Sequence, residues 1–233
     1  MDTQVIIPIS TSFNLDIVQV EISSKCVLKC PRCPRTELLT PFLNQEIDLD
    51  TFMQAFTPEV LSQIKYLLFC GHHGDSIYAS DFLKIVDYVK QHSNTHIRLI
   101  TNGSYKPVHW WRELASVLDS HDEIHWSLDG WDQASNEQYR VRSDWSSIQT
   151  GLKAFQLLNR STYLVWAAIA FRFNQDYISH IKELAKTYEF DCFQLTKSTK
   201  FGSKYPSTYG IEDLLEPTDP ALVASAYRFE RVV

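Results

Sequence analysis

The amino-acid sequence predicts an α/β fold, in which a parallel sheet is covered on its outside by helices. Three observations predict it. Short apolar segments alternate with segments of helical periodicity, each short apolar segment ends at a turn-forming residue, and polar residues follow several of these ends. A closed eight-unit barrel needs about 250 residues, and only six strand–helix units fit before this 233-residue chain becomes irregular near Ser198. We therefore predict an open, partial (β/α)6 TIM-like barrel.

The predicted strands are apolar segments in which side chains alternate between the two faces of a sheet. In the first segment, Val18, Val20 and Ile22 share one face. The short segments stop at Gly, Asn, Asp or Thr, as strands that enter a turn do. In chain order the six segments are residues 17–22, 65–70, 96–100, 123–128, 163–171 and 191–195.

The predicted helices lie between the strands, where apolar residues recur at intervals of three and four. Residues 48–64 are also helical, but Thr57-Pro58 is expected to break them in two, with Pro58 starting the second helix. The other helices are expected over residues 82–89, 111–118, 148–158 and 178–188, with a short one near 222–229. The chain thus divides into an N-terminal extension (1–14), the barrel (15–198) and a short, irregular C-terminal extension (199–233).

Composition restricts the class of protein. The net charge is −6 and there is no long basic run, so a nucleic-acid partner is not expected. No apolar run reaches the ~20 residues that span a bilayer, and the N-terminus does not read as a secretion signal. We expect a cytoplasmic protein with no membrane association. One basic cluster stands out, Lys25, Lys29, Arg32 and Arg35, which is either a solvated loop or a docking patch for an acidic partner.

Three of the five cysteines, Cys26, Cys30 and Cys33, fall in one short segment with C-x3-C-x2-C spacing. In a cytoplasmic protein such a cluster indicates a metal or redox site rather than a disulfide framework. Three thiolates can hold three irons of a [4Fe–4S] cluster and leave the fourth iron open to a small molecule. S-adenosylmethionine can chelate that iron through its amino and carboxylate groups.

A structural zinc site is the alternative interpretation of these cysteines. Its fourth ligand would come from Cys70, His72 or His73. Zinc fingers generally show two separated pairs of ligands, which the three-cysteine spacing fits poorly. Cys70 and Cys192 each stand alone in an apolar segment, and we expect them to pack in the core.

With this cysteine spacing after the first of six predicted strands, the sequence resembles the radical S-adenosylmethionine superfamily. The loop form C-x3-C-P-x-C is similar to that of its peptide- and small-molecule-modifying branch, and the resemblance covers residues 15–198. It implies a cluster on Cys26, Cys30 and Cys33, where one electron splits S-adenosylmethionine into methionine and a 5′-deoxyadenosyl radical. The C-terminal extension lacks the cysteines that bind auxiliary clusters in many peptide-modifying relatives, so we expect a single cluster.

The resemblance also implies which residues bind S-adenosylmethionine. In the family, a glycine-rich turn after the second strand meets the amino group of the methionine moiety. The residues in that place here are Gly71, His72, His73, Gly74 and Asp75. A turn that contains Gly allows the close backbone approach that such binding requires.

Further contacts are implied after the third, fourth and sixth strands. Thr101 and Asn102 match a frequent turn after the third strand. In the family, further positions contact the ribose and the carboxylate of S-adenosylmethionine. They are matched here by Ser127, Asp129 and Arg140, with Arg142 as the alternative to Arg140. Gln194 and Leu195 on the sixth strand would lie near the adenine.

We therefore predict an enzyme that cleaves S-adenosylmethionine reductively and abstracts hydrogen from an organic substrate. A peptide or protein side chain is favoured as substrate on the resemblance alone, and a small molecule or a nucleotide is the alternative. A non-catalytic zinc- or metal-binding module is the alternative from a different class. The electron donor would be a protein such as flavodoxin or ferredoxin, which Lys29, Arg32 and Arg35 could attract. No residue is assigned to the chemistry of the substrate radical.

Overall fold

A sheet of seven strands, in the order β1-β2-β3-β4-β5-β6-β7, forms the centre of the fold. The computed structural model describes residues 14–37, 44–71, 73–197, 215–223 and 229–232. Neighbouring strands from β1 to β6 run parallel, and β7 pairs antiparallel with β6. The strands are β1 (Leu15–Val20), β2 (Ile64–Phe69), β3 (His96–Thr101), β4 (Glu123–Ser127), β5 (Tyr163–Ile169), β6 (Cys192–Thr196) and β7 (Phe229–Val232).

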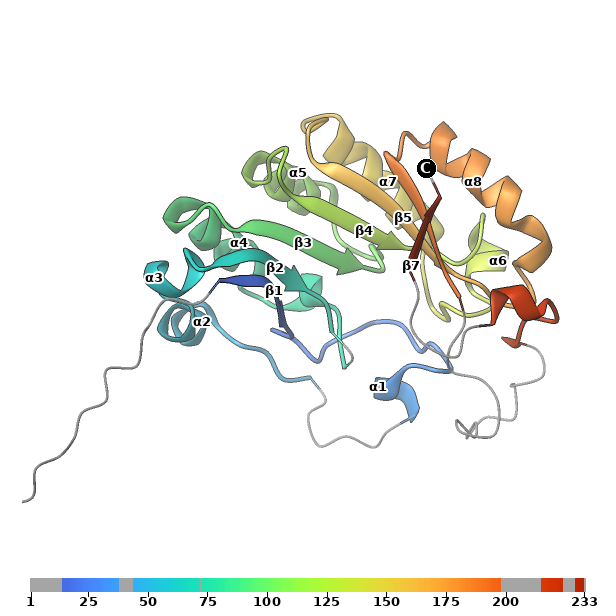
Figure 1. Ribbon diagram of the computed structural model, residues 1–233, viewed down its shortest axis with the longest axis horizontal. Helices are drawn as coiled ribbons and strands as arrows, with labels where there is room; N and C mark the ends of the chain where they lie inside the picture. Colours follow the sequence, from blue (N-terminus) through green and yellow to red (C-terminus); the bar gives the residue numbers. More distant parts are fainter. Residues whose placement is uncertain (1–13, 38–43, 72, 198–214, 224–228, 233) are drawn as a thin grey trace, which may run out of the picture.

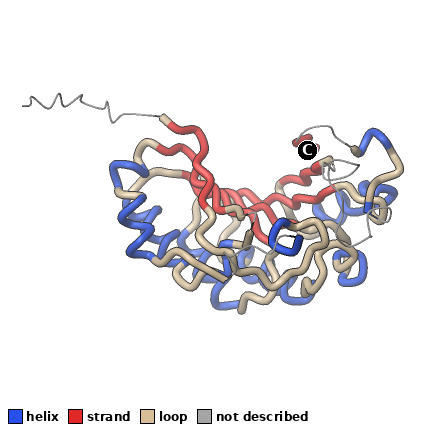
Figure 2. Tube along the Cα trace, turned by 90° about the horizontal axis from the view of Figure 1, so that it is seen from below, coloured by secondary structure: helices blue, strands red, loops and turns tan. Residues whose placement is uncertain are grey.

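The sheet is curved into a trough whose convex side carries the long helices (Figures 1 and 2). β1 and β7 are its two edges, so the barrel is open as predicted. The helices are α1 (Pro34–Glu37), α2 (Leu49–Ala55), α3 (Pro58–Leu61), α4 (Phe82–His92), α5 (Val108–Val117), α6 (Gln133–Asn136), α7 (Trp145–Gln156) and α8 (Ile178–Thr187). In the described parts of the chain, no helix has the length and apolar character to cross a membrane.

The core lies between the sheet and the helices. Leu67, Leu99, Trp126 and Trp166, one from each of four adjacent strands, face the helices and are 0% exposed. The ring of Trp126 stacks on that of Trp111 in α5, with a centroid separation of 4.5 Å. Because side chains alternate along a strand, the residues between these core positions face the concave side of the trough. That face carries the polar residues of the candidate site.

The predicted break at Thr57-Pro58 is confirmed. α2 ends at Ala55 and α3 begins at Pro58, with the Thr57 hydroxyl accepting a hydrogen bond from the Val60 N–H at 3.4 Å. Proline suits the first position of a helix because its missing N–H would have no partner there.

The C-terminal extension contributes a strand that was not predicted. The helix expected near residues 222–229 falls mainly on residues 224–228, which lie outside the described residues; before them Pro220–Leu222 forms a single 3-10 turn, and after them Phe229–Val232 is strand β7. The edge of β6 presents backbone groups that need partners, and β7 supplies them. The first strand also begins earlier than expected, at Leu15, and ends at Val20. The chain leaves the sheet there, and Ser23 pairs with Glu46 instead.

Candidate functional site

The cysteine loop lies at the carboxyl end of the parallel sheet, where the turns after β2, β3 and β4 also lie. Cys26, Cys30 and Cys33 line one cavity of about 230 Å³. The other predicted site residues that line it are Gly71, Gly74, Asp75, Thr101, Asn102, Ser127 and Arg140. The fold thus brings together residues that are far apart in the sequence, as expected for the carboxyl ends of parallel strands.

The backbone of the cysteine loop is held from two sides. The Asp75 N–H donates to the Lys25 carbonyl at 2.9 Å, and the Lys29 N–H donates to the Val141 carbonyl at 3.0 Å. Leu28 packs in a small apolar cluster next to the loop. These contacts orient the three cysteines toward the cavity.

Gly74 fixes the distance between the cysteine loop and the turn after β2. A Cβ atom at this position would lie 2.1 Å from the carbonyl oxygen of Ser23. No side chain fits there without a backbone shift, so the turn reaches the cysteine loop because residue 74 is glycine.

The thiols are buried in a way that disfavours their charged form. Burial raises the pKa of Cys26 to about 12, and the negative charge of Asp75 raises it further. Burial also raises the pKa of Cys30 to about 11, although the nearby Arg140 guanidinium lowers it in part. At neutral pH both thiols are therefore protonated unless a cation at the site compensates the thiolate charge. Three soft sulfur donors that line one cavity fit an iron–sulfur cluster.

A single-ion site matches the geometry less well. Within the described residues, no group of three or more Cys, His, Asp and Glu side chains is arranged to hold one metal ion. Cys70 was expected in the core, but it is only partly buried and lines the cysteine cavity. Burial, together with the charges of Asp75 and Glu21, raises the pKa of Cys70 to about 11. Cys192 is buried, as predicted.

Asp75 organises the turn after β3. One of its carboxylate oxygens accepts hydrogen bonds from the Thr101 hydroxyl at 3.0 Å and from the Asn102 backbone and side-chain N–H groups at 2.7 and 2.6 Å. Asn102 Nδ2 also lies 3.9 Å from Cys26 Sγ. Burial raises the pKa of Asp75 in spite of these hydrogen bonds. The network therefore holds a carboxyl group and an amide beside the first cysteine.

Arg140 is positioned by Asp129. Arg140 Nε donates to Asp129 Oδ2 at 2.6 Å, and the Ile169 N–H donates to Asp129 Oδ1 at 2.7 Å. Asp129 is 0% exposed and does not line the cavity, so the structure places it behind Arg140 rather than against a ligand. Arg142 is exposed and also lies outside the cavity lining. Of the two arginines, the position of Arg140 suits the predicted role.

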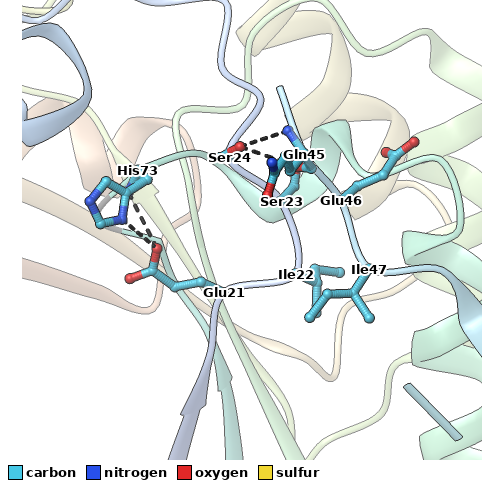
Figure 3. A pocket seen from close by; sticks show the side chains of 8 residues that line it. All are labelled: Glu21, Ile22, Ser23, Ser24, Gln45, Glu46, Ile47 and His73. Atoms are coloured by element: carbon cyan, nitrogen blue, oxygen red, sulfur yellow. Dashed lines mark hydrogen bonds and ion pairs between the residues drawn. The ribbon is translucent and has the colours of Figure 1, made fainter. Parts of the chain in front are cut away.

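The histidines of the turn after β2 do not join the cysteines where the structure describes them. His73 turns toward Glu21, with Nδ1 3.3 Å from the carboxylate, and both line a separate cavity of about 210 Å³ (Figure 3). His72 lies outside the described residues. The expected contact between His73 and S-adenosylmethionine is therefore not supported by its position.

A second cavity of about 660 Å³ occupies the concave face of the sheet. It adjoins the first, because six residues line both: Cys70, Gly71, Ile100, Ser127, Arg140 and Ile169. Gln194 lines the larger cavity, whereas Leu195 packs against the hydrophobic core. Adjacent residues of a strand face opposite ways, so only Gln194 can occupy the predicted place near the adenine.

Arg98 and His125 also line the larger cavity, and neither was among the predicted site residues. Both lie on the concave face of their strands, Arg98 on β3 and His125 on β4. The alternation of side chains along these strands was the signal that could have identified them.

The basic cluster does not form one exposed face. Arg32 is 3% exposed and lines the cysteine cavity. Arg35 Nε donates to the Ser24 carbonyl at 3.0 Å. Lys25 Nζ lies 2.8 Å from the Glu46 carboxylate. Lys29 is exposed, so it is the member of the cluster that is best placed to meet a partner.

The geometry is similar to that of solved structures. SuiB from Streptococcus suis, bound to its precursor peptide SuiA, matches with a TM-score of 0.65 and 17% identity over 87% of this chain and 44% of that chain. Native anSMEcpe with bound AdoMet matches with a TM-score of 0.61 and 18% identity over 82% of this chain and 56% of that chain. TYW1 with a lysine–pyruvate adduct bound matches with a TM-score of 0.57 and 11% identity over 86% of this chain and 68% of that chain. The chain has the fold of radical S-adenosylmethionine enzymes.

At these identities the similarity to radical S-adenosylmethionine enzymes is one of fold. The chain spans about half the length of the anSMEcpe chain that it matches. No protein-family model and no curated protein matches the sequence.

Proposed function

We propose that this chain binds one [4Fe–4S] cluster through Cys26, Cys30 and Cys33, and that it is a radical S-adenosylmethionine enzyme that abstracts hydrogen from an organic substrate. The observation that carries the proposal is that these thiols line one cavity at the carboxyl end of an open sheet with this fold. When bound, the cluster supplies the electron that cleaves S-adenosylmethionine to methionine and a 5′-deoxyadenosyl radical.

The chain's own residues bind and orient S-adenosylmethionine. Gly71 and Gly74 line the cavity wall where its amino group would bind, and Asp75 lines the same wall. Arg140 offers a guanidinium to the carboxylate, and Asp129 holds that guanidinium in place. Because Arg140 lines both cavities, a molecule bound there reaches from the cysteine cavity into the larger one.

The larger cavity receives the nucleoside and the substrate. Ser127 lies at the junction of the two cavities, where its hydroxyl can meet the ribose. Gln194 and the small Ala167 line the wall on which the adenine would lie. A volume of about 660 Å³ is within the ~300–1,000 Å³ of typical ligand sites, enough for part of a nucleoside and a side chain.

A peptide or protein side chain is the favoured substrate. Structures with this fold include SuiB with a precursor peptide and anSMEcpe with AdoMet and a peptide. A small molecule is the second candidate, because TYW1 with a lysine–pyruvate adduct shares the fold as well. The electron donor would be an acidic protein such as flavodoxin or ferredoxin, and the exposed Lys29 is a docking contact for it.

Anaerobic reconstitution tests the proposal. The purified chain should bind about four irons and release 5′-deoxyadenosine when given S-adenosylmethionine and dithionite. Cys30→Ala should abolish both, and Cys192→Ala, a buried cysteine that lines neither cavity, is the matched control that should keep both. A colourless protein with one zinc ion, or equal loss in the two variants, would contradict the assignment.

A further inference from the structure

Three polar residues follow one another along the concave face of β4. Glu123, His125 and Ser127 alternate with the buried Ile124 and Trp126, so their side chains point away from the helices. His125 and Ser127 both line the 660 Å³ cavity. Ser127 is at the end near the cysteines, and His125 lies about 7 Å further down the strand. A substrate in this cavity can therefore contact His125 in the part of the cavity that lies further from the cysteines.

Glu123 is held as a carboxylate by Arg98. The two residues are direct neighbours across β3 and β4, and the guanidinium binds the carboxylate with two hydrogen bonds of 2.9 and 3.0 Å. Burial alone would raise the pKa of Glu123, but the hydrogen bonds from His125 and Arg98 outweigh it and lower the pKa to about 2. Glu123 is thus ionised at neutral pH, and Arg98 already balances its charge.

This carboxylate determines which nitrogen of His125 carries hydrogen. His125 Nε2 lies 2.9 Å from Glu123 Oε2. A carboxylate only accepts hydrogen bonds, so Nε2 is the N–H donor and Nδ1 of the neutral ring has a free lone pair. None of the described residues forms a hydrogen bond with Nδ1. The side chain of His125 is 7% exposed, and the cavity is the space that it faces.

We propose that His125 is an acid–base residue of this enzyme, which accepts a proton from the substrate on Nδ1 while Glu123 and Arg98 hold the ring. The inference rests on the proposed function, because it assigns a role in the same cavity. In the step, a heteroatom–hydrogen bond of the substrate breaks heterolytically, its electron pair stays on the heteroatom, and the proton binds Nδ1. The imidazolium that forms is stabilised by the Glu123 carboxylate at the other nitrogen.

His96 is a natural control for this assignment. It lies on the concave face of β3, two residues before Arg98, and its ring packs edge-on against Tyr66. Its Nδ1 is buried without a hydrogen-bond partner, and His96 is absent from the described lining of the large cavity. A histidine on the same face therefore lacks both the carboxylate and the access to substrate.

Nitrogen NMR of the full chain with ¹⁵N-labelled histidines tests the arrangement without any substrate. We expect the neutral form of the His125 ring to carry hydrogen on Nε2 only. Glu123→Gln should disturb this single tautomer, because an amide can also donate to the ring, and should leave the His96 signals unchanged. A neutral His125 ring that carries hydrogen on Nδ1 rather than on Nε2 overturns the proposal.

Turnover by the reconstituted enzyme tests the catalytic role, with a random peptide library as the probe and mass change of the peptides as the readout. His125→Gln keeps an N–H that can bind Glu123 but has no basic nitrogen. If the role of His125 were purely structural, glutamine could take it over and the variant would remain active. We expect product formation to fall about 100-fold or more, with His96→Gln unchanged; an unchanged His125→Gln overturns the proposal. If the wild type modifies no peptide, the proposed substrate class fails, and the tautomer experiment still decides the assignment of His125.

Discussion

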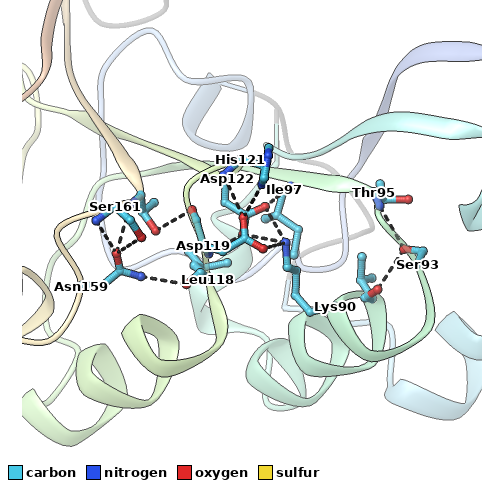
Figure 4. Close-up of polar contacts among 12 residues, drawn as sticks. Lys90, Ser93, Thr95, Ile97, Leu118, Asp119, His121, Asp122, Asn159 and Ser161 are labelled. Atoms are coloured by element: carbon cyan, nitrogen blue, oxygen red, sulfur yellow. Dashed lines mark hydrogen bonds and ion pairs between the residues drawn. The ribbon is translucent and has the colours of Figure 1, made fainter.

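The buried polar groups at the two ends of the parallel sheet have opposite surroundings. At the amino end, Asp122 is 0% exposed, and its carboxylate accepts the N–H groups of Ile97 at 2.7 Å and of Asp119 at 2.9 Å (Figure 4). Lys90 Nζ lies 2.9 Å from the same carboxylate and 2.8 Å from that of Asp119. The Asp122 carboxylate is the buried centre of this network and its contacts are with groups of the protein itself, so its role is to hold α4 and the strand starts together.

At the carboxyl end, the polar groups point into a cavity. Burial raises the pKa of Cys26 and Cys30, and it also raises that of Asp75. These groups are placed where their charged forms are unfavourable in the chain alone. The comparison separates a buried polar group with a complete set of partners, which stabilises the fold, from groups beside a cavity whose ionisation is disfavoured in the chain alone, for which we propose a role in ligand binding.

The largest effect on stability is expected at the amino end. In Asp122→Asn, one acceptor oxygen becomes an N–H₂ group that faces donors, and Lys90 loses one of its two carboxylates. We expect the free energy of unfolding to fall by about 3 kcal/mol, measured by urea unfolding of the metal-free chain. Glu183→Ala, which removes an exposed carboxylate paired with Lys186, is the control and should cause no measurable change. A small loss in Asp122→Asn would show that the amino-end network is not what stabilises the sheet.

Glu123 sharpens the comparison, because it starts β4 at the amino end and yet faces the concave side. Its pKa is lowered from 4.5 to about 2, so its stabilising contribution is present above the unfolded-state pKa and is lost as the pH falls toward 2. Between about pH 5 and about pH 2, the wild type should therefore lose about 2 kcal/mol more than Glu123→Gln. Parallel acid-unfolding curves of the two proteins would contradict the ion-paired geometry with Arg98.

Much of the fold follows from local patterns in the sequence. The six parallel strands and the break at Pro58 were predicted from apolar periodicity and from the chemistry of proline. Strand β7 was not, because four residues become a strand only when β6 offers them an edge. Such pairing depends on tertiary contacts that no local pattern contains.

The sequence predicts which turns come together at the site, but it does not predict which of their side chains face the cavity. The positions of Asp75 and Arg140 follow from the strand order, since the ends of parallel strands share one edge. Leu195 was misplaced because the alternation along β6 was not applied to it. His73 turned to Glu21, and Arg32 is buried, because contacts between loops decided their orientation.

The smallest effect is expected from Asp75→Asn, which is the same chemical change as Asp122→Asn at the opposite end of the sheet. Asp75 has no cation among its hydrogen-bond partners, and an asparagine oxygen can accept the hydrogen bonds from Thr101 and Asn102. We expect the free energy of unfolding of the metal-free chain to change by less than about 1 kcal/mol, by urea unfolding at neutral pH.

The pH dependence of this variant has a definite sign. Because the pKa of Asp75 is raised by burial, the wild type is favoured below the unfolded-state pKa and loses that advantage as the pH rises through the raised value. Asp75→Asn should therefore gain stability relative to the wild type from acid to neutral pH, while its release of 5′-deoxyadenosine falls. A loss of stability as large as that of Asp122→Asn would mean that Asp75 belongs to the structural network after all, and the contrast between the two ends of the sheet would not hold.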